Sequence, residues 1–456
     1  MNIKKIIHTN KKNIINIIAF IILVVLGAYI FYLRFPNNFN QPNFYAEDGY
    51  IFAHNLINKG FINSIFEIFN GYYLWGVYLL GEIGIIVNSI LFKGNLLYLP
   101  QSFALVSYFF LSLCVTLPLF LFRKIIGSLP LFLLISFSLF LPMPGSDYAI
   151  IGTISNLKFL FLYLAFLLII YRNVAGRNIK KIILIDFIIL ICGFTNINVY
   201  LLIPFGLYHY INKYSISGCK KIFKDITFIS YVTLGLLLLL QLVVIKINGI
   251  PKLVGYLDSP FNFARAIEIF IYRPFVFVCT EPILKNLNNL STLLITGILI
   301  ILIVIYNQRK NIWIYLMGGV AIFFPGIIFA INRTGISDHF FGYLSSGPDQ
   351  FFYTQNLITL FVLTILLGDV WHYYSENKKI KYLTIIPIIL FFPIYVLHSG
   401  SFGGNNFMEK NVGNVFINAK NACNTQRGLN IQFSVYPEKK VPKMILERDS
   451  VCSDDM

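Results

Sequence analysis

Two adjacent carboxylates, Glu47 and Asp48, stand in the aromatic stretch Asn-Phe-Tyr-Ala-Glu-Asp-Gly-Tyr at 43–50. A carboxylate at such a place can act as a general base that takes a proton from an attacking hydroxyl group. An Asp-Gly pair is also a frequent turn, and an isolated acidic pair is often only a solvated loop. The stretch is therefore both a candidate active site and a candidate turn.

The two carboxylates are not equivalent. Neighbouring side chains point to opposite sides of an extended segment and diverge by about 100° on a helix. Aspartate holds its carboxylate on a shorter, more rigid side chain, so we expect Asp48 to be the base and Glu47 to support it. The alternative is that Asp48 caps the N-terminus of the amphipathic run that follows Gly49.

The composition indicates which kind of secondary structure must position these residues. Hydrophobic residues make up 57% of the chain and charged residues 12%, and the mean hydropathy is +0.73. This composition is typical of a polytopic membrane protein. The net charge of +16 would suggest nucleic acid for a soluble domain, but in a membrane protein basic residues set topology and meet lipid headgroups. We expect membrane lipids, and no nucleic acid, as partners.

The hydrophobic segments predict an all-α polytopic membrane protein with about eleven transmembrane helices. Basic residues precede the first segment and fill the short loops on the same side, so the N-terminus is expected in the cytoplasm and the C-terminus outside. The carboxylates concentrate on the outer side. The expected spans lie near 14–33, 97–122, 128–142, 150–170, 181–195, 198–211, 226–246, 288–306, 311–331, 351–369 and 382–398.

Segment 72–92 is long enough to cross the membrane but carries Glu82 and several glycines. A crossing here would invert every later loop and move the basic residues outside. We therefore predict a juxtamembrane helix that begins with the aromatic run Gly-Tyr-Tyr-Leu-Trp at 71–75. Asp186 lies within a span, where a charge facing lipid is costly, so we expect it to face the bundle interior or the inner interface.

The chain divides into a transmembrane domain, 1–398, and an extracytoplasmic tail, 399–456. Within the first, the long outer segments are 34–96, 247–287 and 332–350. Cys423 and Cys452 are the only cysteine pair in the tail, and an oxidising compartment would let them form a disulfide. Two unpaired thiols are the alternative.

The first outer segment, together with two further motifs, resembles the GT-C superfamily of integral-membrane glycosyltransferases. Within that superfamily the chain is similar to the phage-type, serotype-converting O-antigen glucosyltransferases of enteric bacteria. The similar stretches are Tyr-Ala-Glu-Asp-Gly at 45–49, Gly-Thr-Ile-Ser-Asn-Leu-Lys-Phe at 152–159 and Gly-Pro-Asp-Gln-Phe-Phe-Tyr at 347–353.

The resemblance implies a transfer of a sugar, with glucose expected, from a polyprenyl-phosphate donor to a lipid-linked or O-antigen glycan outside the bacterial inner membrane. It also implies a separate transferase that makes the donor and a flippase that delivers it. Metal dependence differs within the superfamily, so no cofactor is certain and a divalent cation stays open. Asp338 and His339 are weak candidates for metal ligands, with an ordinary loop contact as the alternative.

Transfer from a lipid phosphate needs cations that stabilise the departing phosphate. Arginine suits phosphate oxygens best, so Arg265 and Arg273 are the first candidates and Arg333 and Lys158 follow. Contact with water or lipid headgroups is the alternative for each. Residues that could contact the sugar or the acceptor are Tyr45, Tyr50, Tyr72, Trp75 and Asp349, and for the aromatic ones an interfacial belt is an equal alternative.

Two other classes stay open. An O-antigen polymerase or ligase would act on a lipid-linked glycan, but such enzymes rely on arginine-rich middle loops instead of an acidic pair after the first span. A flippase or transporter would need charges within several spans or internal repeats. Asp186 is nearly alone within the expected spans, which favours the transferase.

Overall fold

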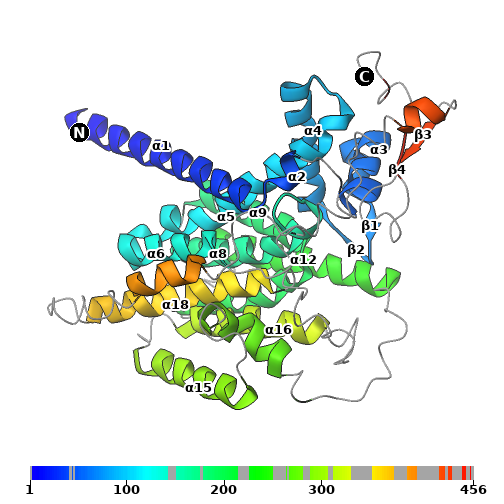
Figure 1. Ribbon diagram of the computed structural model, residues 1–456. Coiled ribbons are helices and arrows are strands. Elements are labelled where there is room, and N and C mark those ends of the chain that lie inside the picture. Colours follow the sequence, from blue (N-terminus) through cyan, green and yellow to red (C-terminus); the bar gives the residue numbers. More distant parts are fainter. Residues whose placement is uncertain are drawn as a thin grey trace.

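The computed structural model of the chain is built almost entirely of helices (Figure 1). Within the described residues, two small pairs of antiparallel strands are the addition to the all-helical class expected from the sequence. The residues that the structure describes are 3–40, 44, 47–141, 150–174, 178–213, 225–249, 263, 267–280, 288–306, 312–329, 352–373, 388–397, 421–426, 430–433, 444–447 and 452.

Each segment expected to span the membrane contains a helix. By length and composition, six helices of the described residues can cross a membrane, and four shorter apolar helices accompany them. The chain is thus a helical membrane protein, and the number of eleven spans stays a prediction. The larger helices are α1 (Ile3–Arg34), α4 (Trp75–Phe92), α5 (Leu99–Ile126), α6 (Ser128–Leu139), α8 (Leu160–Val174), α9 (Ile179–Gly193), α10 (Ile203–Lys213), α12 (Ile226–Asn248), α15 (Asn289–Tyr306), α16 (Ile312–Phe329), α18 (Tyr353–Tyr373) and a last helix, Ile388–Leu397.

Shorter elements connect these helices. Several of them are 3₁₀ or π-helical turns, which occur in short pieces and often at functional sites. They are α2 (Asn37–Asn40), η1 (Asp48–Ala53), α3 (His54–Ser64), η2 (Leu96–Tyr98), η3 (Ser155–Phe159), η4 (Ile197–Leu202), η5 (Glu268–Val276) and α14 (Phe277–Thr280).

Helices α1 and α5 lie antiparallel. At one end Phe20 packs on Phe120, with ring centroids 5.0 Å apart. At the other end the Tyr108 hydroxyl donates a hydrogen bond to the Phe35 carbonyl at 3.0 Å. Arg34 ends α1 there, and its buried guanidinium donates to the carbonyls of Leu139, the last residue of α6, and Leu141, at 2.7 and 2.8 Å. We call this the Arg34 end of the bundle.

Helix α4 packs on the first part of α5, beyond the level where α1 ends. A Cβ atom added at Gly84 would lie 2.5 Å from the Phe103 ring, and Ser102 donates to Asn88 at 3.4 Å. The contacts between α1 and α5 described above start only at Tyr108. Helix α4 is long and apolar enough to cross a membrane, and its partners Ser102 and Phe103 lie within the expected span 97–122, so the prediction that 72–92 does not cross stays a prediction.

The stretch 68–73 is a β-hairpin, so the prediction of a helix starting at residue 71 was wrong. Strands β1 (Ile68–Phe69) and β2 (Tyr72–Tyr73) pair antiparallel, and the helix begins at Trp75. Asn70 and Gly71 both have positive φ, 53° and 89°. An Asn-Gly pair between apolar residues is the usual sequence of such a two-residue turn. That signal was present in the sequence.

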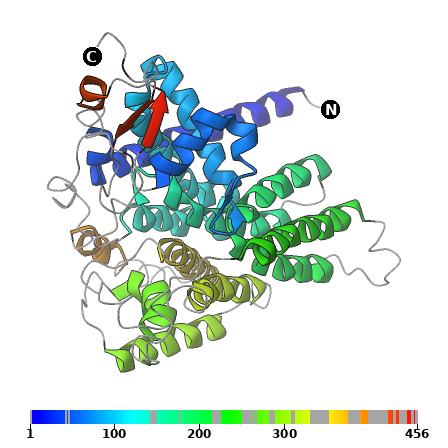
Figure 2. The same cartoon turned by 90° about the vertical axis from the view of Figure 1, so that its right-hand side faces the viewer.

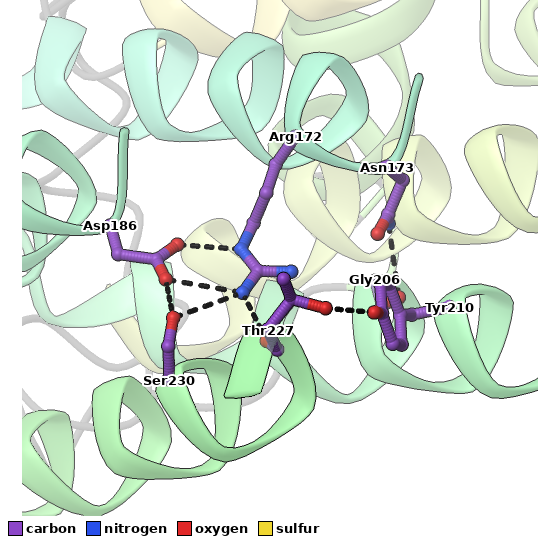
Figure 3. Close-up of polar contacts among 7 residues, drawn as sticks. All are labelled: Arg172, Asn173, Asp186, Gly206, Tyr210, Thr227 and Ser230. Carbon is purple, nitrogen blue, oxygen red and sulfur yellow. Dashed lines mark hydrogen bonds and ion pairs between the residues drawn. The ribbon is translucent and has the colours of Figure 1, made fainter. Parts of the chain in front are cut away.

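A buried polar cluster joins α8, α9 and α12 (Figure 3). Arg172 donates from Nε to one oxygen of Asp186 at 2.6 Å and from Nη2 to the other at 3.1 Å. Nη2 also reaches the Thr227 carbonyl at 2.8 Å, the Ser230 hydroxyl binds the same carboxylate, and the Tyr231 ring centroid lies 3.9 Å from the guanidinium. Asp186 therefore faces the bundle interior, which confirms the expectation for a carboxylate within a span.

Candidate active site

Asp48 is buried and holds a helix terminus from a distant part of the chain. One carboxylate oxygen accepts the backbone N–H of Ile154 at 3.0 Å, and the other accepts that of Ser155 at 2.8 Å. These N–H groups lie at the start of η3, which continues into α8, where a helix leaves its first N–H groups without internal partners. Asp48 therefore caps this helix and not the amphipathic run that follows it in sequence.

The surroundings of Asp48 change its acidity. Burial raises the pKa of this carboxyl from 3.8 to about 7, although the hydrogen bonds from Ser155 and Ile154 lower it, and the charge of Glu47 adds a smaller increase. A pKa near neutrality suits a general base. However, the residue is only 2% exposed, and both of its oxygens already face backbone N–H groups.

The segment that Asp48 holds is also fixed from two other directions. Asn38 donates to the Ile151 carbonyl at 2.7 Å, and the Gly152 N–H donates to the Ser107 hydroxyl at 3.1 Å. Gly152 has a φ of +88°, and a Cβ atom there would lie 2.6 Å from the Asn38 side chain. Only glycine fits this close approach, so the start of the Gly-Thr-Ile-Ser motif is a packing requirement of the site.

Lys158 lies on the same short helix as the residues that bind Asp48. Side chains three residues apart in a 3₁₀ turn project from one side, so Ser155 and Lys158 share the side that faces the first outer loop. The Lys158 ammonium lies 5.8 Å from the ring centroid of Phe69 in β1, and Phe69 packs edge-on against Phe52 of η1, with centroids 5.9 Å apart. The Lys158 side chain thus lies against β1, which packs on η1, and the backbone of the same short helix binds Asp48.

Glu47 is the more accessible carboxylate. It precedes η1 and is half-buried. Burial, and secondarily the charge of Glu47, raises the pKa of the Tyr50 hydroxyl, so the two groups interact electrostatically. Of the two adjacent acids, Glu47 is the one with part of its side chain open to a bound molecule.

Two predicted aromatic contacts lie in or next to the β1–β2 hairpin. Tyr72 is half-buried in β2. Trp75 stacks on Phe194, with ring centroids 4.3 Å apart and planes 15° apart, so one face of the indole is already covered. The hairpin itself is held by Gln241 of α12, which bonds both the N–H and the carbonyl of Tyr73.

Arg273 lies in η5, which packs on other helices than those around the carboxylate pair. Arg273 is 8% exposed, and its Nε lies 3.6 Å from Glu268 in the same helix, η5. Thr359 of α18 donates to the Pro274 carbonyl at 2.9 Å, and η5 packs against α15, α16 and α18. The described contacts therefore group Lys158 with the carboxylate pair and Arg273 with α18.

Other predicted site residues lie outside the part of the chain that the structure describes. Among the described residues, no three His, Cys, Asp or Glu side chains lie together in a way that could hold a metal ion. The predicted residues outside the described part are Tyr45, Arg265, Arg333, Asp338, His339 and Asp349.

The tail pair Cys423 and Cys452 is joined by a disulfide. Strands β3 (Asn430–Phe433) and β4 (Met444–Glu447) lie between the two cysteines and pair antiparallel. Strand β4 lies against η1 and α3, as the red strands beside the blue helices show in Figures 1 and 2. The sequence predicted a tail pair, but it carried no signal for where the tail docks.

The fold and composition define the class of this chain as a helical membrane protein. Comparison with known proteins adds no family to that class, because no protein-family model, curated protein or solved structure matches the chain. The candidate site therefore stands on the geometry described above.

Proposed function

We propose that this protein is a membrane glycosyltransferase that moves a sugar, with glucose expected, from a polyprenyl-phosphate donor to a lipid-linked or O-antigen glycan. The observation that carries the proposal is that one short helix, η3, both binds the Asp48 carboxylate and carries the Lys158 ammonium group. Ile154 and Ser155 bind Asp48 through their backbone N–H groups, and the same short helix carries Lys158. A carboxylate pair and a cation at one helix terminus supply what transfer from a phosphate donor needs. The motif resemblance to GT-C enzymes points the same way.

The proposed reaction is a displacement at the anomeric carbon of the donor sugar. The acceptor hydroxyl attacks that carbon and gives its proton to a carboxylate base, while the bond to the phosphate oxygen breaks and the phosphate keeps the electron pair. Lys158, on the short helix whose N-terminus Asp48 caps, would stabilise the departing phosphate. Desolvation between the aromatic side chains would strengthen this attraction.

The geometry favours an exchange of the two acid roles expected from the sequence. Both oxygens of Asp48 are engaged by backbone N–H groups, and the side chain is buried. A base must come within hydrogen-bond reach of the proton that it accepts, and Glu47 is the more exposed acid. We therefore assign Glu47 as the base and Asp48 as the residue that positions the helix terminus.

The proposal places the chain in a bacterial inner membrane, with the site on the periplasmic face. The relative arrangement agrees with that topology. Helix α1 leads to the Arg34 end, where segment 150–155 and the first outer loop meet. Strand β4 of the C-terminal tail packs on that loop. The start of α1 and the tail thus lie at opposite ends of the bundle, as Figure 1 also shows.

The test uses glycan analysis of cells with and without the gene to identify the modification. The purified protein in lipid nanodiscs is then assayed with polyprenyl-phosphate glucose and the unmodified glycan. Glu47→Gln should lower kcat by about 100-fold or more, the size expected for loss of a general base. Lys158→Met should lower kcat/KM for the donor by about tenfold or more, since hydrogen bonds to charged groups contribute roughly 1.5–3 kcal/mol.

Matched controls lie in the same loop. Lys59 and Glu67 form an exposed ion pair at 2.8 Å, and such pairs contribute little to stability. Lys59→Met and Glu67→Gln should therefore keep wild-type activity. Transfer from a nucleotide sugar in place of the lipid donor would contradict the proposed donor class. Full activity of Glu47→Gln, together with loss of activity in a stably folded Asp48→Asn, would contradict the assignment of Glu47 as the base.

A further inference from the structure

The C-terminal tail is connected to the candidate site in two ways. Strand β4 lies against η1, which directly follows Glu47, and against α3. Ala422 is 3% exposed and belongs to the main apolar core, and the two cysteines of the disulfide pack on that core. The hairpin is thus anchored at its base and rests on the loop that carries the carboxylates (Figure 2).

The hairpin and η1 are both structures that need outside support. A two-stranded hairpin of four-residue strands is marginally stable by itself, and the disulfide restricts it by joining residues 29 positions apart on its two sides. A π-helical turn such as η1 is rare and occurs mostly at functional sites. In α3, which follows, Gly60 has a positive φ of 71° that interrupts the helix. Contact with a closed hairpin supplies a rigid neighbour for this segment.

We propose that the disulfide-closed hairpin is a positioning element of the active site, which holds η1 and thereby Glu47 in the orientation needed for proton transfer. The inference rests on the proposed function for its catalytic part. Its structural part, that the closed hairpin restrains η1, stands by itself. Cys423 and Cys452 are in this sense positioning residues, because they act on Glu47 only through β4 and η1.

The first experiment measures catalysis in the double variant Cys423→Ser/Cys452→Ser, in nanodiscs. Loss of the restraint should lower kcat by roughly 10- to 100-fold, the cost of misplacing a reacting group, while KM for the lipid donor stays the same. Treatment of the wild type with a dithiol converts the disulfide to two thiols as the dithiol is oxidised to its own disulfide. This treatment should lower the kcat of the wild type by the same factor, and it should leave the kcat of the double variant unchanged. If the double variant does not reach the membrane, reduction of the folded wild type makes the same comparison.

The second experiment does not depend on activity. Backbone amide exchange, followed by mass spectrometry, should become faster in peptides that cover 47–64 when the disulfide is reduced or replaced. Peptides from α9 serve as the control and should not change. Wild-type kcat and unchanged exchange at 47–64 in the reduced protein would overturn the inference. If the wild type transfers sugar from no lipid donor, the proposed function fails, and the exchange result still decides whether the hairpin restrains η1.

Discussion

Asp48 and Glu47 are adjacent in sequence but have different surroundings. Asp48 is enclosed by the start of the helix at 154–155, and Glu47 stays half-buried beside Tyr50. One acid can then fix the backbone while its neighbour meets a substrate. Both residues have helical backbone conformation, and adjacent side chains on a helix diverge by about 100°, which makes the two residues separable by experiment.

Replacement of Asp48 by asparagine tests its structural role. The amide keeps one acceptor oxygen but turns an NH₂ group toward a buried backbone N–H, and a buried donor without its partner costs about 1–3 kcal/mol. Asp48→Asn should therefore lower the thermal unfolding midpoint in detergent at pH 4. Glu47→Gln should leave the midpoint unchanged. A stability of Asp48→Asn equal to that of the wild type would argue against the capping role.

The pH dependence of the same comparison has a defined sign. The carboxyl of Asp48 has a pKa of about 7 in the folded protein and 3.8 as its ordinary value. The folded state thus holds a proton that the unfolded state has lost, so this group's contribution to stability is complete below pH 3.8 and is lost as the pH rises through 7. Unfolding midpoints of the wild type, relative to those of Asp48→Asn, should fall over this range. A difference that is independent of pH would contradict the raised pKa.

At the scale of elements, the helices are joined by buried polar contacts as well as by apolar packing. Arg172 ties α8 to α9 and α12 through the Asp186 carboxylate and the Thr227 carbonyl (Figure 3). An ion pair removed from water contributes little net stability, but a single member left alone is costly. The cluster therefore disfavours any arrangement in which Arg172 of α8 is buried without Asp186 of α9.

Substitution in this cluster should be strongly non-additive. Arg172→Met or Asp186→Leu alone leaves an uncompensated buried charge and should destabilise the protein by about 3–5 kcal/mol. The double variant Arg172→Met/Asp186→Leu should recover much of that loss. Protein yield from membranes and unfolding midpoints in detergent measure the effect. Additive losses would show that the two side chains do not act as a pair.

At the scale of the whole molecule, the site and the tail lie at one end of the bundle and the start of α1 lies at the other (Figure 1). We expect a cytoplasmic N-terminus and a periplasmic C-terminus, with 72–92 outside the membrane layer. Alkaline phosphatase fused after Met456 should be active, and the same fusion after Arg309 should be inactive. The opposite pair of results would move the partners of the acidic pair, among them Lys158, to the cytoplasmic side and would contradict the proposed periplasmic reaction.

The sequence by itself determined the helical membrane class, since hydrophobic segments and their basic flanks are local features that need no folded partner. It also identified the acidic pair, Lys158 and the tail cysteines as residues of interest. Asn70-Gly71 would have predicted the first hairpin as well, because that turn signal is equally local.

Only the tertiary structure decided how these parts act on one another. The contact between Asp48 and residues 154–155 spans more than a hundred positions, and so no periodicity or spacing reveals which acid is buried and which is open. The same holds for the pairing of Arg172 with Asp186 and for the docking of β4 on η1. The physical reason is that burial and hydrogen-bond partners depend on which helices pack together. In a membrane bundle nearly every helix is apolar on most sides, so its local pattern does not specify its neighbours.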